Sequence, residues 1–161
     1  MSEHPSIARF RVELEQRGGQ GRIVVLPDSV HTAVLAAQAL GCAVGAIVKS
    51  LLFAAVADDG EPTPVLVLTS GAHQVDTAKV AGTAGVAELR RATPEFVRTH
   101  TGQVIGGVSP IAHPAPLPTY LDTALRQYPE IWAAAGHPAA VFSTSYDELA
   151  AMTGATETEV S

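Results

Sequence analysis

One lysine of the sequence lies within an apolar segment. Lys49 follows Ala-Ile-Val and precedes Ser-Leu-Leu-Phe in residues 46–53. Its stem could lie on apolar surface with the ammonium in water, which is the commoner arrangement for a lysine in a strand. Alternatively the ammonium lines a cleft, where a fixed positive charge stabilises a developing oxyanion or binds phosphate. Lys49 is therefore the first candidate for a catalytic role.

A glycine- and proline-rich segment is the second candidate. Residues 101–114 read TGQVIGGVSPIAHP. Paired glycines let a backbone approach a ligand closely, and the proline that follows holds it rigid. Amide groups exposed in such a loop bind an anion or a hydroxyl. A tight structural crossover would use the same residue types. The candidate binding residues here are Gly106, Gly107, Val108, Ser109 and Pro110.

Several single residues are further candidates for substrate binding, namely Ser50, His31, His113, Gly136 and His137. Ser50 neighbours Lys49 but would face the opposite side of a regular strand. His137 stands between a predicted strand and a proline turn, where a side chain can point into a pocket. A lone histidine is also common as a surface or capping residue, so both interpretations stay open.

The sequence predicts no metal site and no cofactor. Its six histidines include no pair at the i, i+4 spacing, and its one cysteine excludes a multi-cysteine zinc site. It also lacks the glycine-rich phosphate-binding motifs of nucleotide enzymes. Any chemistry must therefore come from the side chains and backbone described above.

Composition limits the function classes. The chain has 161 residues, 47% of them hydrophobic, and a net charge of −6. These values predict a folded domain, and an acidic domain cannot hold nucleic acid by a general electrostatic grip. Any nucleic acid must be bound locally, by a small basic patch. The absence of a long apolar run and of a secretory pattern predicts a cytoplasmic protein without membrane contact.

The pattern of hydrophobic residues predicts a mixture of helices and strands without regular alternation, and hence one α/β domain with a mixed, curled sheet. A terminal segment at 157–161 is expected to fray. The expected helices are 7–16, 30–40 capped by Ser29, 76–81, 93–102 and 145–152. The expected strands are 22–26, 51–57 after a short helical turn, 65–69, 88–90, 119–121, 131–134 and 140–143, with residues 103–118 irregular.

Taken together, several segments resemble the YbaK/prolyl-tRNA synthetase-associated domain family of aminoacyl-tRNA deacylases. The resemblance covers about residues 22–152, in the family's order and spacing. The segments that carry it are Thr32–Gly41 (TAVLAAQALG), Ile47–Phe53 (IVKSLLF), Thr101–Gly102, Gly106–Ile111 (GGVSPI) and Gly136–Phe142 (GHPAAVF).

This resemblance implies a fold and a function. The fold is a single α/β domain over residues 1–161, with a curled, barrel-like mixed sheet surrounded by helices. The implied activity is a free-standing deacylase that clears a mischarged tRNA, often a proline tRNA, by ester hydrolysis. The family's essential lysine corresponds to Lys49, and its G-x-x-x-P loop to Gly106–Pro110. Three positions depart from residues found in the family. Ala46 stands where a polar residue is common, and Ala112 where glycine is common. His137 follows Gly136 where some members that clear cysteinyl-tRNA have lysine, which weakens an assignment to the cysteine-specific branch.

The implied partner is the acceptor end of a tRNA, with no role for DNA or a membrane. A transient contact with an aminoacyl-tRNA synthetase is compatible with this role. Two other functions remain open at this point. One is a catalytically silent module that binds a tRNA acceptor end or a nucleotide, and the other is a hydrolase of small esters or amides.

Overall fold

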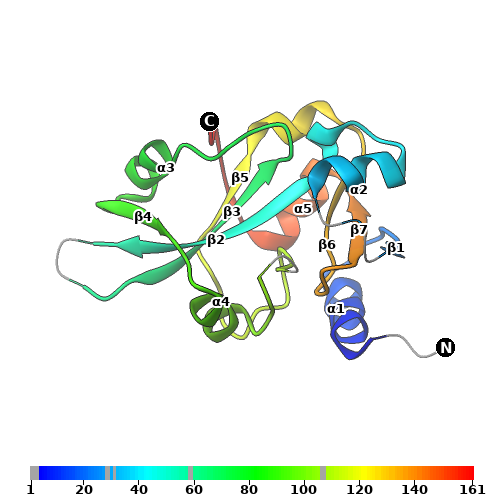
Figure 1. The fold of residues 1–161 in the computed structure, drawn as a ribbon, viewed down its shortest axis with the longest axis horizontal. Helices are drawn as coiled ribbons and strands as arrows, with labels where there is room; N and C mark the ends of the chain where they lie inside the picture. Colours follow the sequence, from blue (N-terminus) through cyan, green and yellow to red (C-terminus); the bar gives the residue numbers. More distant parts are fainter. Residues whose placement is uncertain (1–3, 28–29, 31, 58–59, 106–107) are drawn as a thin grey trace.

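The strands of the computed structural model fall into two sheets (Figure 1). The structure describes residues 4–27, 30, 32–57, 60–105 and 108–161. Its elements are α1 (Pro5–Gln16), β1 (Ile23–Val25), α2 (Ala33–Leu40), η1 (Val44–Ala46), β2 (Val48–Val56), β3 (Thr63–Ser70), α3 (Thr77–Ala84), β4 (Glu88–Arg91), α4 (Pro94–Thr101), β5 (Thr119–Asp122), η2 (Thr123–Gln127), β6 (Ile131–Ala134), β7 (Ala140–Thr144), α5 (Tyr146–Thr153) and β8 (Thr156–Thr158).

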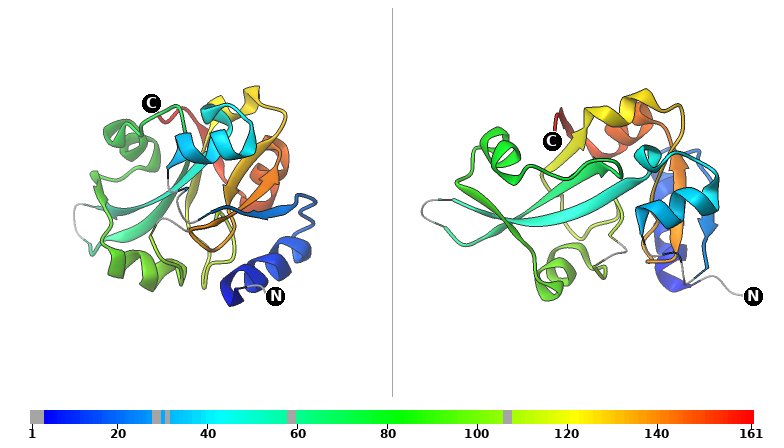
Figure 2. Two further views of the ribbon diagram at one scale, coloured as in Figure 1. Left: turned by 45° about the vertical axis from the view of Figure 1, so that its right-hand side comes forward. Right: turned by 45° about the horizontal axis from the view of Figure 1, so that its top comes forward.

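The larger sheet mixes parallel and antiparallel pairs, which confirms the predicted mixed α/β class. Its strand order is β4-β2-β3-β5-β8, and the smaller sheet has the order β1-β7-β6. In the described residues neither sheet closes on itself, so the expected barrel-like form is not found. The reason is that an isolated bridge, Ile47 to Trp132, joins the sheets instead of a continuous ladder. Two further views place α1 beside the smaller sheet, with α3 and β4 at the other end of the molecule (Figure 2).

Strand β3 is buried on both faces and separates two clusters of core residues. Leu66 and Leu68 face the main cluster, which also contains Phe142 of β7. Val65 and Val67 face the second cluster, under α3. Because alternate side chains of one strand point to opposite faces, β3 is anchored in both clusters up to its C-terminal end. That end carries the polar residues of the candidate site.

Several predicted boundaries are confirmed, and others shift. The side-chain oxygens of Thr93 and Ser145 cap α4 and α5 as expected. Helix α2 starts later than predicted, because Thr32 caps it by accepting a hydrogen bond from the Leu35 amide at 3.1 Å. The predicted cap, Ser29, lies outside the described residues. Strand β2 begins at Val48, earlier than expected, directly after the short η1 turn.

The prediction that the C-terminal residues fray is wrong. Residues Thr156–Thr158 form β8, which pairs in parallel with β5. Val160 is 0% exposed and packs in the cluster under α3. Its carbonyl also accepts a hydrogen bond from the Asp76 amide at 2.7 Å. The buried valine and the strand ladder hold the segment in place.

No helix in the described part of the chain has the length and apolar character needed to cross a membrane.

Candidate functional site

Lys49 is held at its ammonium group. It lies on β2 opposite Thr69 of β3, in a part of β2 that the ladder to β4 does not reach. The side chain is partly buried, and its Nζ donates a hydrogen bond to the carbonyl oxygen of His73 at 2.7 Å. Among the described residues, no carboxylate pairs with this ammonium. The result is a fixed cation whose remaining N–H groups are available.

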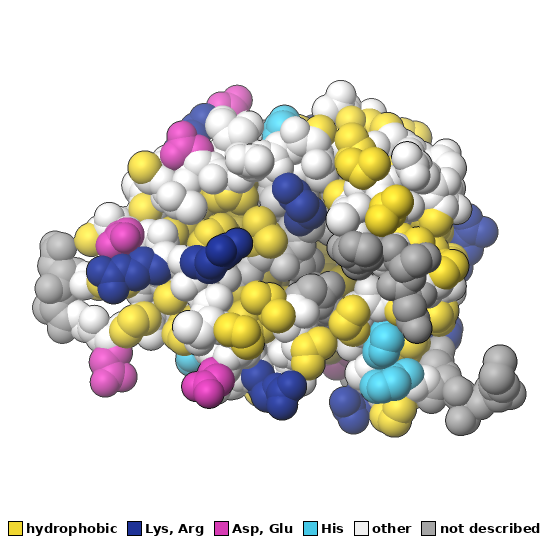
Figure 3. Space-filling view, in the orientation of Figure 1, with side chains coloured by type: hydrophobic (Ala, Val, Ile, Leu, Met, Phe, Trp, Pro, Cys, Tyr) yellow, Lys and Arg dark blue, Asp and Glu magenta, His cyan; other side chains and the backbone are white. Residues whose placement is uncertain are grey.

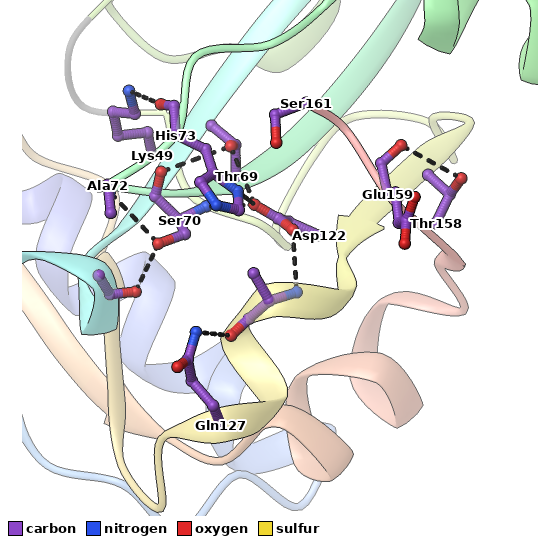
Figure 4. A network of polar contacts seen from close by, with 12 residues as sticks. Lys49, Thr69, Ser70, Ala72, His73, Asp122, Gln127, Thr158, Glu159 and Ser161 are labelled. Carbon is purple, nitrogen blue, oxygen red and sulfur yellow. Dashed lines mark hydrogen bonds and ion pairs between the residues drawn. The ribbon is translucent and has the colours of Figure 1, made fainter.

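The buried carboxylate of Asp122 gathers four donors around one point (Figure 4). Its side chain is 2% exposed. Oδ2 accepts from the Thr69 hydroxyl at 3.2 Å, the Ser70 amide at 3.0 Å and Nδ1 of His73 at 2.9 Å. Oδ1 accepts from the Ala124 amide at 2.9 Å. This single group therefore joins the ends of β3 and β5 to the loop that presents the His73 carbonyl.

The loop between Ser70 and His73 is also attached to the start of β2. The Ser70 hydroxyl donates to the Gly45 carbonyl at 2.7 Å, and the Gly71 amide donates to the Ile47 carbonyl at 2.7 Å. A Cβ at Gly71 would collide with the backbone oxygen of Val44, so the close approach requires glycine. These bonds make the loop a rigid support for the acceptor of Lys49.

Ser50 points away from Lys49, as the strand pattern predicts. It pairs with Leu68, on the face of β2 and β3 that covers the main cluster. Its hydroxyl is buried, with no hydrogen-bond partner among the described residues. A buried hydroxyl without a partner loses its hydrogen bond to water, so this group is a destabilising feature unless a ligand satisfies it.

The described part of the glycine loop is tightly held. Val108, Ser109 and Pro110 are buried. The side-chain amide of Gln103 accepts from the Ser109 amide at 2.7 Å and donates to its hydroxyl at 2.9 Å. Nε2 of His113 lies 2.8 Å from the Ser109 carbonyl. Gly106 and Gly107 lie outside the described residues, and none of the described hydrogen bonds joins Lys49 to residues 108–110.

Two turns need left-handed backbone. Ala112 has φ 70°, a conformation that costs an L-residue roughly 1–2 kcal/mol and that glycine adopts freely. Glycine would adopt this turn without that cost. Gly136 has φ 83°, and a Cβ there would lie 3.1 Å from the Ser6 carbonyl and 3.2 Å from the Phe10 Cβ. Helix α1 therefore packs directly on the Gly136 turn.

His137 faces α1. Its Nδ1 accepts from the Ala139 amide at 3.0 Å, and its ring lies 4.6 Å from that of His4, centroid to centroid. His137 lines a cavity of about 1060 Å³ together with His113 and Gly136. The cavity lies between α1, the end of α4 and the segments 103–104 and 112–114, and neither Lys49 nor Ser50 lines it.

The structure thus divides the predicted site residues. His113, Gly136 and His137 line one cavity, whereas Lys49 lies at a separate position beside His73. His31 is outside the described residues. The sequence interpretation missed Asp122, His73 and Gln103. The available signal was an acidic residue directly after a predicted strand, since Asp122 follows the strand predicted at 119–121 and forms the last residue of β5 in the structure.

In the described ranges, no group of three or more His, Cys, Asp or Glu side chains is arranged to hold a metal ion. The chemistry available at Lys49 is that of a positioned ammonium beside a rigid backbone loop.

The sequence and the fold of this chain are similar to those of known proteins. Residues 27–152 match the model of the family described as "Aminoacyl-tRNA editing domain". A crystal structure named as a candidate trans-editing enzyme for prolyl tRNA synthetase superposes with a TM-score of 0.89 at 48% identity, covering 99% of this chain and 98% of that one.

Two curated proteins are also similar. The proline–tRNA ligase of Limosilactobacillus fermentum is 37% identical over 81 residues, which are 50% of this chain but 14% of the ligase. The protein EbsC of Enterococcus faecalis, named as a candidate Cys-tRNA(Pro)/Cys-tRNA(Cys) deacylase, is 29% identical over 125 residues, covering 73% of this chain and 74% of that protein.

Replacing the buried carboxylate tests its structural role. In the variant Asp122→Asn, an NH₂ group replaces one of the two carboxylate oxygens. The donors that bonded to that oxygen then lack an acceptor. We expect the free energy of unfolding to fall by about 2–4 kcal/mol, measured by urea denaturation. The exposed Asp147 on α5 provides the control, and Asp147→Asn should change stability by less than about 1 kcal/mol. Equal losses in both variants would contradict the role given to Asp122.

The His113 ring predicts a pH dependence of stability. Burial lowers the pKa of His113 below its ordinary value of 6.5, although the Ser109 carbonyl partly opposes the shift. Near pH 6.5 the ring therefore binds a proton in the unfolded chain but not in the folded one. Proton binding then favours the unfolded chain, so the free energy of unfolding falls as the pH is lowered below 6.5.

The variant His113→Gln cannot titrate. Between pH 7 and pH 5 it should lose less unfolding free energy than the parent does, measured by urea denaturation at each pH. The same loss in both proteins would show that His113 is not responsible.

Proposed function

The chain belongs to the aminoacyl-tRNA editing domain family, and we propose that it acts in trans as an aminoacyl-tRNA deacylase. The reaction is hydrolysis of the ester between an incorrect amino acid and the 3′-terminal adenosine of a tRNA. We propose a proline tRNA as the substrate, because similar proteins are named for prolyl-tRNA synthetase or for tRNA(Pro). The proposal takes residues 1–161 as one editing domain, with its core at about 22–152, acting in the cytoplasm.

The observation that carries the proposal is the hydrogen bond from Lys49 to His73. Among the described residues, the ammonium donates one hydrogen bond, of 2.7 Å, to a backbone carbonyl, and this bond fixes its position without pairing it with a carboxylate. One N–H is used by His73, which leaves two for a substrate oxygen. A preorganised cation of this kind stabilises negative charge that develops during a reaction, because no reorganisation is needed at that moment.

Ester hydrolysis needs this stabilisation more than it needs a strong nucleophile. Water attacks the carbonyl carbon, and the carbonyl oxygen becomes an oxyanion that accepts hydrogen bonds from Lys49. The intermediate then breaks the bond between that carbon and the ribose oxygen. The ribose oxygen leaves as a hydroxyl after it takes up the proton that the water has lost.

We propose that the substrate itself carries this proton, through its neighbouring ribose hydroxyl or its amino group. A second candidate for carrying the proton is His137, but its ring lies against His4 in the cavity between α1 and the end of α4, which Lys49 does not line. The backbone of 106–110 is proposed to hold the terminal ribose. Support comes from the way Gln103 and His113 fix Ser109 on three sides.

Lysine substitutions test the mechanism directly. The variant Lys49→Ala should lower the single-turnover rate of amino acid release from mischarged tRNA by about 10²–10³-fold, as expected for loss of an oxyanion donor. The control is Lys79→Ala on α3, which removes the same charge at an exposed position where Lys79 contacts Glu159. It should retain the parent rate within about twofold.

Three outcomes would contradict the proposal. A folded Lys49→Ala protein that keeps the parent rate would remove Lys49 from the mechanism. Tight binding of charged tRNA by the parent without amino acid release would favour a binding module. Equal turnover of aminoacyl esters that lack tRNA would favour a general esterase.

A further inference from the structure

Positively charged side chains line the cavity between α1 and α4. Arg9 and Arg98 line it from opposite helices. In the described part of the chain, neither guanidinium forms an ion pair. Glu13 also lines the cavity, but its carboxylate accepts from Arg17 at 2.8 Å. The cavity is therefore a local basic site on a chain whose net charge is −6.

The same cavity offers flat and apolar surfaces. Val12 and Val104 line it and are 53% and 41% exposed. The tilted pair of His4 and His137 rings forms part of its wall. In the space-filling view, basic, histidine and apolar side chains gather along the edge of the molecule where α4 and α1 lie (Figure 3). Proteins that bind single-stranded nucleic acid combine these two features, cations for the phosphates and rings or apolar groups for the bases.

We propose that this cavity binds the single-stranded acceptor end of the tRNA, with Arg9 and Arg98 contacting its phosphates. The inference rests on the proposed function, and it adds a binding site distinct from Lys49. A volume of about 1060 Å³ lies at the upper limit for small-ligand pockets and accommodates a short stretch of single strand. Helix α1, which supplies one wall, lies outside the residues 27–152 matched by the family model.

The cavity is also connected to the glycine loop. Gln103 and His113 line the cavity, and both bond to Ser109 of that loop. A strand held by Arg9 and Arg98 would therefore lie beside the segment proposed to hold the terminal ribose. This continuity favours the RNA that carries the ester over an unrelated acidic ligand.

The test compares two double variants that change net charge equally. One is Arg9→Ala/Arg98→Ala in the cavity, and the other is Arg90→Ala/Arg91→Ala on β4, at the far end of the molecule (Figure 1). The probe is an uncharged RNA hairpin that has the acceptor stem of a proline tRNA and its single-stranded 3′ end. The dissociation constant is measured across a series of salt concentrations.

We expect the cavity variant to bind at least about fivefold more weakly at low salt. Its plot of log affinity against log salt should flatten by about 1.4, because each lost contact to a single-stranded phosphate removes about 0.7. The β4 variant should keep the parent slope. Equal slopes in both variants, or equal competition by a glutamate-rich peptide of the same charge, would overturn the inference.

Hydrolysis by the parent protein, measured on the same preparation, separates the two proposals. Amino acid release together with unchanged slopes would overturn the cavity site alone. A flattened slope without release would support the cavity site and contradict the deacylase. All four arginines are exposed, so melting temperatures of both variants should stay close to that of the parent and exclude misfolding as the cause.

Discussion

The candidate site depends on one buried carboxylate. Asp122 holds the end of β3, the start of η2 and the His73 ring at once, and the His73 backbone in turn holds the ammonium of Lys49. A buried carboxylate is costly unless donors surround it, so these bonds oblige the loop to adopt one conformation. The position of Lys49 is thus set by groups on β3 and β5 as much as by its own strand.

The proposed catalytic site and the proposed RNA-binding site lie at two different places in the molecule. In the proposed function, Lys49 supplies charge stabilisation at the start of β2. The cavity between α1 and α4 supplies two arginines that form no ion pair with the described residues. Burial lowers the pKa of His113, which lines that cavity. Arg9 and Arg98, rather than His113, therefore give the cavity its positive charge. An acidic chain can in this way bind a polyanion over a short stretch without a general attraction for nucleic acid.

How far the sequence predicts the structure depends on how local the cause is. Thr93 and Ser145 cap their helices through hydrogen bonds three residues away, so those starts were predictable. The C-terminal strand was not, because Val160 is buried by residues of β2, β3 and α3, distant in the chain. The segment around Lys49 could be singled out from the resemblance. Its contact with His73 could not, because parallel pairing of β3 and β5 first brings Asp122 to that loop.

The proposed function requires a Lys49 ammonium that is fixed and faces the substrate. The chain has two lysines, Lys49 and Lys79, so ¹⁵N-labelled lysine gives a spectrum of two ammonium groups. A non-hydrolysable aminoacyl-adenosine should shift the Lys49 signal and slow its hydrogen exchange with water, and leave Lys79 unchanged. A Lys49 signal that ignores saturating analogue, or that moves no more than that of Lys79, would contradict the claim.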